Sequence, residues 1–222
     1  MVLGEGEEVD VEVLRLFQRA RDEGWSKHDF LLEAAKIQGV YVPSLYEPVY
    51  NADGTLAEMR CLPGAPEKVT KRIISDLDSV YYPTNPIVPS TEIVHDRVNV
   101  ELFRGCVRGC RFCQAGYVYR PIRAKKPETV IRQGIESIRN TGSQEATLLS
   151  LSSSDYRHLP EACDGLLDWC EPRNVSLSLP SLRADNFSME LMSRLQKVRR
   201  GGLTFAPEAG TQRLRDVINK NV

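Results

Sequence analysis

Three cysteines in a short stretch constrain this chain more than any other feature of its sequence. Cys106, Cys110 and Cys113 are spaced C-x3-C-x2-C and follow a run of strand-forming residues at 98–103. Thiolates are soft ligands that suit zinc or iron–sulfur clusters. A structural zinc site is closed by four protein ligands, and an ordinary four-iron cluster also takes four cysteines. Three cysteines therefore predict a metal centre with one position left for a ligand that is not protein.

The other three cysteines have a simpler interpretation. Cys163 and Cys170 lie two helical turns apart on one face of a predicted helix, and Cys61 stands at the end of a predicted strand. We expect all three to be small buried residues of the core. Zinc stays an alternative for the three-cysteine motif. A zinc ion bound there would need a fourth ligand, and the candidates are Cys61, His95, His158 and Cys163. None of them stands at a spacing typical of zinc modules.

Composition narrows the class of protein. The 222 residues include 29 Lys and Arg against 30 Asp and Glu, so net charge argues neither for nor against a nucleic-acid partner. No apolar run approaches the ~18 residues that a membrane span needs. The acidic N-terminus lacks the pattern of a signal peptide. We therefore expect a cytoplasmic protein without a membrane partner, in which clustered cysteines bind metal rather than form disulfides.

The order of the predicted elements indicates an α/β fold. Strands at 98–103, 146–151, 175–179 and 202–206 alternate with helices at 127–140, 159–170, 188–197 and 211–220. Such alternation predicts a parallel sheet with right-handed crossovers. The long segment at 106–126 follows the first strand at its carboxyl end, where βα folds place their chemistry. Long loops without regular structure are usually functional.

The first part of the chain has a different pattern. Apolar spacing predicts a helix from 11 to 23 capped by Asp10, and Ser26 with Asp29 resembles a capping box that starts a second helix. Residues 46–50 and 56–61 read as a hairpin. Prolines at 83–89 mark a boundary. We therefore predict an N-terminal α+β accessory segment at 1–89 and a core at 90–222.

The cysteine motif, with Phe112 before its third cysteine and on the loop after a first strand, resembles that of the radical S-adenosylmethionine (SAM) superfamily. The resemblance implies a partial TIM-like barrel, with four of the six βα units of the family core. It also implies a 4Fe–4S cluster on the three cysteines, whose fourth iron is chelated by the amino and carboxylate groups of SAM. An electron then cleaves SAM to methionine and a 5′-deoxyadenosyl radical, which abstracts hydrogen from a substrate that the sequence does not identify. The electron donor would be of flavodoxin or ferredoxin type.

The resemblance also implies a set of SAM-binding residues. Phe112 would shield the cluster or pack near the adenine. The loop after the second strand, often Gly-Gly-Glu in the family, would bind the SAM amino group, and here it holds Ser152, Ser153, Ser154 and Asp155. The alternative for this loop is that it caps the next helix. After the third strand, Ser181 and Arg183 would meet the ribose and carboxylate; Arg183 could instead pair with Asp185 or Glu208.

Two further positions come from the last predicted unit. Glu208 follows the fourth predicted strand, where relatives carry a polar residue facing SAM, and Lys220 stands where relatives carry a basic residue near its carboxylate. The alternative for Lys220 is a solvated residue in the last turn of a helix, where the helix dipole favours it. We expect Arg104, Arg108 and Arg111 to offset the negative charge of the cluster.

The two ends of the chain resemble the interior of a longer protein. Residues 1–8 resemble the last strand and loop of a cobalamin-binding-like domain, so cobalamin would belong only to a longer parent protein. The whole chain resembles an internal fragment of an uncharacterised radical SAM family, with a core cut at its C-terminal end. A sheet of four units would leave an open edge strand.

Two alternative functions stay open. Residues 117–126 mix aromatic and basic side chains, which permits methylthiolation of tRNA, although packing of an ordinary loop beneath the cluster explains the same residues. The second alternative is a zinc- or cluster-stabilised binding module without catalysis.

Overall fold

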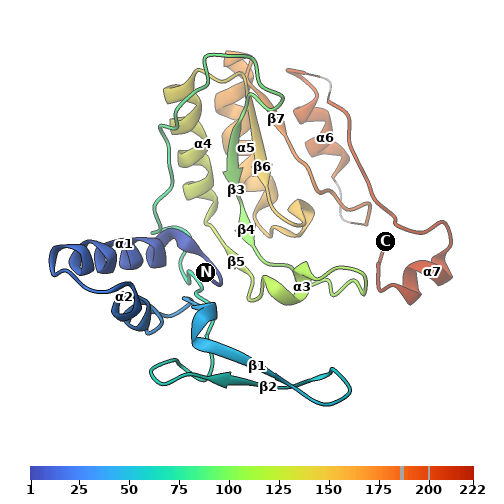
Figure 1. The fold of residues 1–222 in the computed structure, drawn as a ribbon. Coiled ribbons are helices and arrows are strands. Elements are labelled where there is room, and N and C mark those ends of the chain that lie inside the picture. Colours follow the sequence, from blue (N-terminus) through green and yellow to red (C-terminus); the bar gives the residue numbers. More distant parts are fainter. Residues whose placement is uncertain (186–187, 200) are drawn as a thin grey trace. The chain divides into compact units, whose positions relative to one another are not determined.

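A computed structural model of the chain describes residues 1–185, 188–199 and 201–222. Two compact units, Met1–Ser75 and Asp76–Val222, make up the chain (Figure 1). The proline-rich stretch at 83–89 therefore belongs to the second unit. The division into an accessory segment and a core near residue 89 stays a prediction.

Helices open the first unit. Helix α1 spans Gly6–Asp22 and α2 spans Lys27–Ala34. The prediction for α1 was wrong at its start, because Glu5 is its N-cap and Asp10 lies inside the helix. Glu7 and Glu8 occupy the first turn, where the helix dipole favours acidic groups, and so extend the helix backwards. The cap of α2 is confirmed, since Ser26 Oγ accepts a hydrogen bond from the Asp29 N–H at 3.1 Å.

The predicted hairpin is confirmed in the same unit. A short 3-10 turn at Pro43–Leu45 leads into β1, Tyr46–Tyr50, which pairs antiparallel with β2, Leu56–Cys61. Asn51 N–H donates to Thr55 O at 2.8 Å and closes the turn. The small core of this unit is formed by Val9, Ala34, Ala35, Val40, Val42 and Leu45.

The second unit is built on a parallel sheet. Strands β3, Val98–Glu101, β6, Glu145–Leu149, and β7, Ser176–Ser178, lie in the order β3–β6–β7. Val98 pairs with Ala146, and Ala146 with Leu177, so these apolar residues share one face. Since side chains alternate along a strand, the opposite face carries the polar row Asn99, Thr147 and Ser178.

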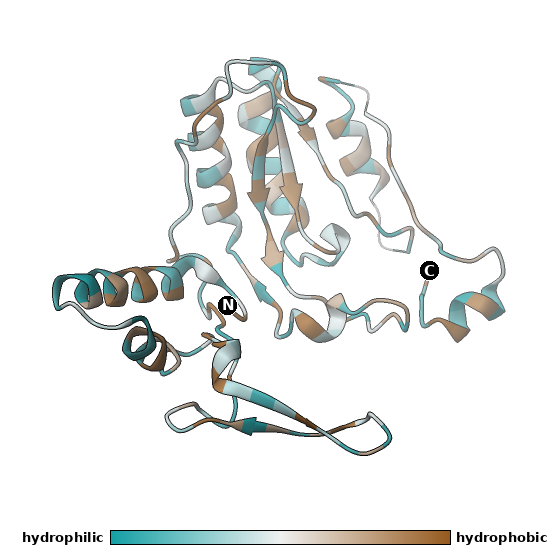
Figure 2. Ribbon diagram, viewed as in Figure 1, coloured by the Kyte–Doolittle hydropathy of each residue, from teal (hydrophilic) through white to brown (hydrophobic). Residues whose placement is uncertain are grey.

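Helices cover the apolar face of the sheet. Helix α4 spans Pro127–Thr141, α5 spans Leu159–Cys170 and α6 spans Met189–Leu195. Buried residues of all three join those of the strands in one core, with Val130, Leu166 and Leu191 among them. Buried residues recur every three to four positions along α4 and α5, as a half-buried helix requires, and Figure 2 shows hydrophobic and hydrophilic residues on both helices. The predicted α/β fold with a parallel sheet is confirmed.

The first predicted strand divides in two. The parallel strand β3 ends at Glu101, and Phe103–Arg104 form β4, which pairs antiparallel with β5, Arg123–Ala124. Leu102, between them, donates its N–H to Leu149 O at 2.9 Å and accepts from Lys125 N–H at 2.9 Å. The backbone of Leu102 thus leaves the sheet without an unpaired polar group. The short helix α3, Ala115–Val118, lies in the loop that follows.

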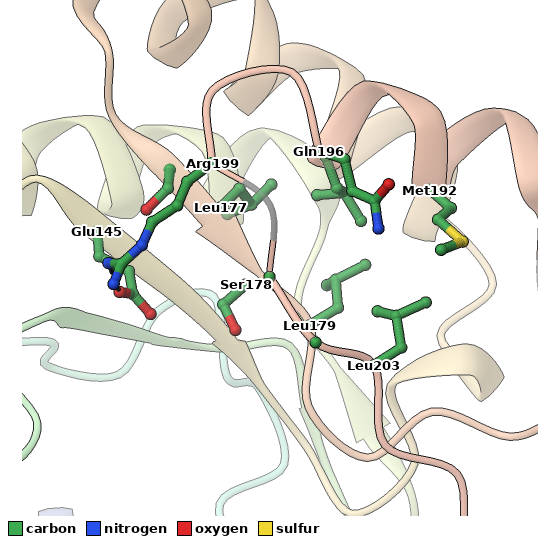
Figure 3. Close-up of a pocket in the computed structure, with 12 residues that line it drawn as sticks. Glu145, Leu177, Ser178, Leu179, Met192, Gln196, Arg199 and Leu203 are labelled. Atoms are coloured by element: carbon green, nitrogen blue, oxygen red, sulfur yellow. Dashed lines mark hydrogen bonds and ion pairs between the residues drawn. The ribbon is translucent and has the colours of Figure 1, made fainter.

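The fourth predicted strand, at 202–206, is not formed. Phe205 makes one isolated parallel bridge to Leu182, and α7, Gln212–Val217, follows. A pocket of about 360 Å³ separates β7 from the segment that contains Leu203 (Figure 3). Two glycines at 201–202 cost conformational entropy, and an edge strand gains hydrogen bonds on one side only. Within the described ranges the sheet is open and no barrel closes.

None of the described helices combines the length and apolar character that crossing a membrane requires.

The core of the sheet gives a direct test of the fold. Leu148 is fully buried in β6, whereas its neighbour Leu149 is 39% exposed. We expect Leu148→Ala to lower the free energy of unfolding by about 2–5 kcal/mol, because it leaves a cavity under the helices. Leu149→Ala is the matched control and should cost less than about 1 kcal/mol. Denaturant unfolding measures both; equal losses would contradict this packing of β6.

Candidate metal centre

The cysteine loop, residues 105–113, starts where β4 ends. Its two glycines are required by the backbone, since Gly105 has φ 98° and Gly109 has φ 65°. A Cβ on Gly105 would lie 2.5 Å from Tyr119 O, closer than real side chains approach. Cys113 N–H donates to Cys110 O at 3.0 Å and closes a turn between the second and third cysteines. The glycines therefore let the loop turn back against the segment at 119–122.

All three motif cysteines are free thiols and partly buried. Their donor chemistry fits an iron–sulfur cluster or zinc. Among the residues that the structure describes, no three His, Cys, Asp or Glu side chains are gathered closely enough to hold a metal ion. The three cysteines fit a cluster or a zinc ion by their residue type and by their place on one loop. To bind it, the three thiols would have to turn toward one another.

Cys163 and Cys170 behave as the sequence predicted. Both are fully buried on α5, and burial raises the pKa of Cys163 to about 12 and that of Cys170 to about 11. These thiols are poor metal ligands, because a metal binds the thiolate. Cys61 is only partly buried, and its Sγ donates to Pro66 O at 3.8 Å. The full burial expected for Cys61 is therefore wrong.

Arg108, between the first two cysteines, reaches to other loops. Its Nε donates to Asp155 Oδ2 at 2.8 Å, and its Nη2 contacts the other oxygen of the same carboxylate. Nη1 lies 3.8 Å from Asp185 Oδ2. Burial acts to raise the pKa of Asp155, but hydrogen bonds from Arg108 and Ser152 outweigh it and hold that pKa below its usual range. The pair is therefore charged at neutral pH.

The loop after β6 packs against the loop after β7. Ser152 Oγ donates to Asp155 Oδ2 at 2.7 Å, and Ser153 Oγ lies 3.0 Å from Ser150 Oγ. Ser154 Oγ accepts from the Arg183 N–H at 3.0 Å, and Ser153 N–H donates to Ser181 O at 3.1 Å. Helix α5 has His158 as its N-cap, without a side-chain cap bond. The alternative that these serines cap α5 is therefore wrong.

Arg183 makes the ion pair that the sequence left open. Its Nε and Nη2 each lie 2.9 Å from an oxygen of Asp185, and Nη2 also contacts Asn221 O. The hydrogen bond from Arg183 is the largest influence on Asp185 and holds the pKa of that carboxyl below its usual range. The partner of Arg183 is thus Asp185.

The C-terminal segment contacts the cysteine loop. Asn219 Nδ2 donates to Arg108 O at 3.1 Å and to Gly109 O at 2.9 Å, and Arg111 N–H donates to Ile218 O at 2.9 Å. Sequence reasoning missed Asn219. The sequence did offer a signal for this residue, namely an asparagine near the end of a predicted helix. Asparagine tolerates the left-handed backbone that follows many helices, and the φ of Asn219 is 56°.

Glu208 and Lys220 form an ion pair with each other. Lys220 Nζ lies 3.4 Å from Glu208 Oε1, and Glu208 has a φ of 67°. A non-glycine residue at positive φ is uncommon and often marks a functional position. The alternative that Lys220 is a solvated residue in the last turn of a helix is wrong, because α7 ends at Val217 and the Lys220 side chain is only 14% exposed.

The remaining predicted residues lie apart from this network. Phe112 is exposed, as are Tyr117 and Tyr119 after it. Arg104 pairs with Glu101 at 2.8 Å, so its charge is already balanced by a carboxylate. Lys125 is buried and donates to Gln133 Oε1 at 2.8 Å, and burial lowers its pKa. The aromatic and basic segment is thus part packed loop and part exposed surface.

The loops therefore meet at one edge of the sheet. The cysteine loop, the loops after β6 and β7, and the segment after α7 all lie beyond the carboxyl ends of the parallel strands (Figure 1). Ion pairs and hydrogen bonds join each of them to another. This is the edge where parallel α/β folds place ligands.

Comparisons with known proteins identify the family. Residues 100–222, more than half of the chain, match the model of the radical SAM superfamily. Residues 1–43 match the model of the N-terminal region of radical SAM proteins. The resemblance of residues 1–8 to a cobalamin-binding-like domain stays a prediction.

Two individual proteins are similar to the chain. An uncharacterized protein of Methanocaldococcus jannaschii is 37% identical over 123 residues, which cover 55% of this chain and 26% of that protein. The chain thus spans about a quarter of the length of that relative. Among solved structures, the radical SAM methyltransferase TsrM of Kitasatospora setae, with tryptophan substrate and a SAM analogue bound, is 16% identical with a TM-score of 0.49. That alignment covers 96% of this chain and 38% of that one.

The two classes of cysteine predict different reactivity. In the metal-free native protein we expect iodoacetamide to modify Cys106, Cys110 and Cys113, because these thiols are partly exposed. Cys163 and Cys170 should stay unmodified, because they are buried and their raised pKa values suppress the reactive thiolate. Peptide mass mapping measures each site, and the denatured protein, in which all six should react, is the control. Modification of Cys163 as fast as Cys106 would contradict this assignment.

Proposed function

The chain belongs to the radical SAM superfamily, and we propose that its cysteine loop binds a 4Fe–4S cluster through Cys106, Cys110 and Cys113. The observation that carries the proposal is the set of three free thiols on one loop after the first parallel strand, inside the matched range. Three thiolates leave one iron of a four-iron cluster without a protein ligand. The amino and carboxylate groups of SAM are proposed to occupy it.

The chemistry that such a centre supplies, once reduced, is the cleavage of SAM to methionine and a 5′-deoxyadenosyl radical. The chain itself would hold the three thiolates and limit the access of water, since each cysteine is partly buried. The proposed electron donor is a flavodoxin- or ferredoxin-type protein. The whole protein is proposed to be an enzyme that abstracts hydrogen from a substrate.

Several side chains support a SAM site beside the cysteines. Glu208 and Lys220 form one ion pair of 3.4 Å, which a ligand with both a carboxylate and an ammonium group can replace with two. Ser181 is exposed after β7, and Phe112 is exposed beside Cys113. We propose these four residues as the SAM contacts. Ser152, Ser153, Ser154, Asp155 and Arg183 are engaged with other protein groups and are proposed to frame the site.

Iron content tests the proposed cluster. After anaerobic reconstitution, we expect close to four irons per wild-type chain, as a 4Fe–4S cluster requires. Ala in place of Cys106, Cys110 or Cys113 should remove most of that iron, because each variant lacks one of the three ligands. Cys61→Ala is the matched control, as a partly buried cysteine outside the loop, and should keep wild-type iron.

Two results would contradict the cluster. One is residual iron in the wild-type protein, and the other is equal iron in the triple alanine variant. Zinc at one equivalent, without 5′-deoxyadenosine after dithionite reduction, would favour the non-catalytic binding module instead.

SAM affinity tests the role of Lys220. In the reconstituted protein we expect Lys220→Met to weaken SAM binding by about tenfold or more, because a hydrogen bond between charged groups contributes about 1.5–3 kcal/mol. Lys197→Met is the matched control, since Lys197 also forms one ion pair, 3.5 Å from Glu171. Equilibrium binding of SAM measures both. Equal affinities for the two variants would remove Lys220 from the site.

A further inference from the structure

We propose that Arg108 is a positioning residue, which fixes the cysteine loop on the loops after β6 and β7 through its ion pair with Asp155. The proposal rests on the proposed cluster, whose geometry this ion pair would set. Arg108 stands two residues after Cys106 and two before Cys110. A restraint on its side chain therefore acts on both of these ligands.

The ion pair between Arg108 and Asp155 has the geometry of a strong, bidentate pair. Two nitrogens of Arg108 face the two oxygens of Asp155, with Nε at 2.8 Å from Oδ2. Bidentate contacts of this kind fix orientation as well as distance. The side chains are 29% and 14% exposed, so solvent screens the pair less than it screens a surface ion pair. Asp185 adds a second carboxylate at 3.8 Å.

The backbone of Arg108 is held by a second segment, the one that follows α7. Asn219 donates to the carbonyl oxygens of Arg108 and Gly109, at 3.1 and 2.9 Å. One residue of the cysteine loop is thus tied to two separate segments, by its side chain to Asp155 and by its carbonyl to Asn219. Within the described parts of the chain, Arg108–Asp155 is the one ion pair that joins the cysteine loop to the loop after β6.

The same geometry gives Asp155 a different role from the one expected at first. Arg108 contacts both oxygens of this carboxylate, and Ser152 Oγ donates to Oδ2 at 2.7 Å. The carboxylate is therefore occupied on both oxygens before SAM arrives. We assign Asp155 to holding Arg108 rather than to binding the SAM amino group.

A double-mutant cycle separates these roles. We expect Arg108→Gln and Asp155→Asn each to lower reconstituted iron at least threefold, and to alter the paramagnetic resonance line shape of the remaining cluster without SAM. The double variant should be no worse than either single variant, because both changes break one interaction. The charge exchange Arg108→Asp with Asp155→Arg should restore at least half of the wild-type iron.

The controls use an exposed ion pair of the same unit. Arg132 Nη1 lies 3.6 Å from Glu136 Oε2 on α4, and Arg132→Gln and Glu136→Gln should leave iron and line shape at wild-type values. Thermal unfolding of each metal-free variant identifies a chain that fails to fold. If both single variants fail, the charge-exchange variant decides: a folded exchange variant without a cluster overturns the proposal.

The outcomes distinguish this inference from the proposed function. If Asp155→Asn keeps the cluster and its line shape but loses SAM affinity, Asp155 is a SAM ligand and the inference fails, while the proposed cluster stands. Additive losses of iron in the double variant also overturn the inference. A wild-type chain that takes up no cluster overturns the proposed function itself.

Discussion

The parallel pairing of β3 with β6 is the constraint on which the rest of the second unit depends. Val100 lies opposite Leu148, and both are fully buried beneath the helices. A shift of the register by one residue would turn this apolar face to the other side of the sheet. Because the strands are parallel and in this register, the loops that follow them leave from the same edge. The cysteine loop and the serine-rich loop are neighbours for this reason.

Ion pairs then connect the loops that the sheet places next to one another. Asp155, Arg108, Asp185 and Arg183 form, in this order, a chain of alternating charges across three loops. Hydrogen bonds within this chain hold the pKa values of both carboxyls low, so the charges persist at neutral pH. Arg183 is only 7% exposed, and an unpaired charge at such a position would be costly. These four residues are therefore understood together rather than as separate ligands.

The six cysteines illustrate how position decides chemistry. Cys163 and Cys170 face the core from α5, where burial suppresses the thiolate. Cys106, Cys110 and Cys113 stand on a glycine-containing loop that no helix or strand covers fully. Spacing alone separated these two classes. Together with Phe112 and the preceding strand, the spacing resembles the motif of the radical SAM superfamily, and the match over residues 100–222 confirms that family.

The sequence by itself determined most of the helices and strands, the α/β class and the cysteine motif. Helix α5 and both strands of the hairpin have the predicted bounds, because their apolar periods and turn residues are local properties. Only the tertiary structure decided which residues from distant parts of the chain contact one another. Leu102 leaves the sheet because Lys125 and Leu149 are both within reach of its backbone. Residues 202–206 do not form a strand, and Phe205 instead makes an isolated bridge to Leu182. Asp155 meets Arg108 across 47 positions of sequence, a contact that no local pattern encodes, because it depends on the register of β3 and β6.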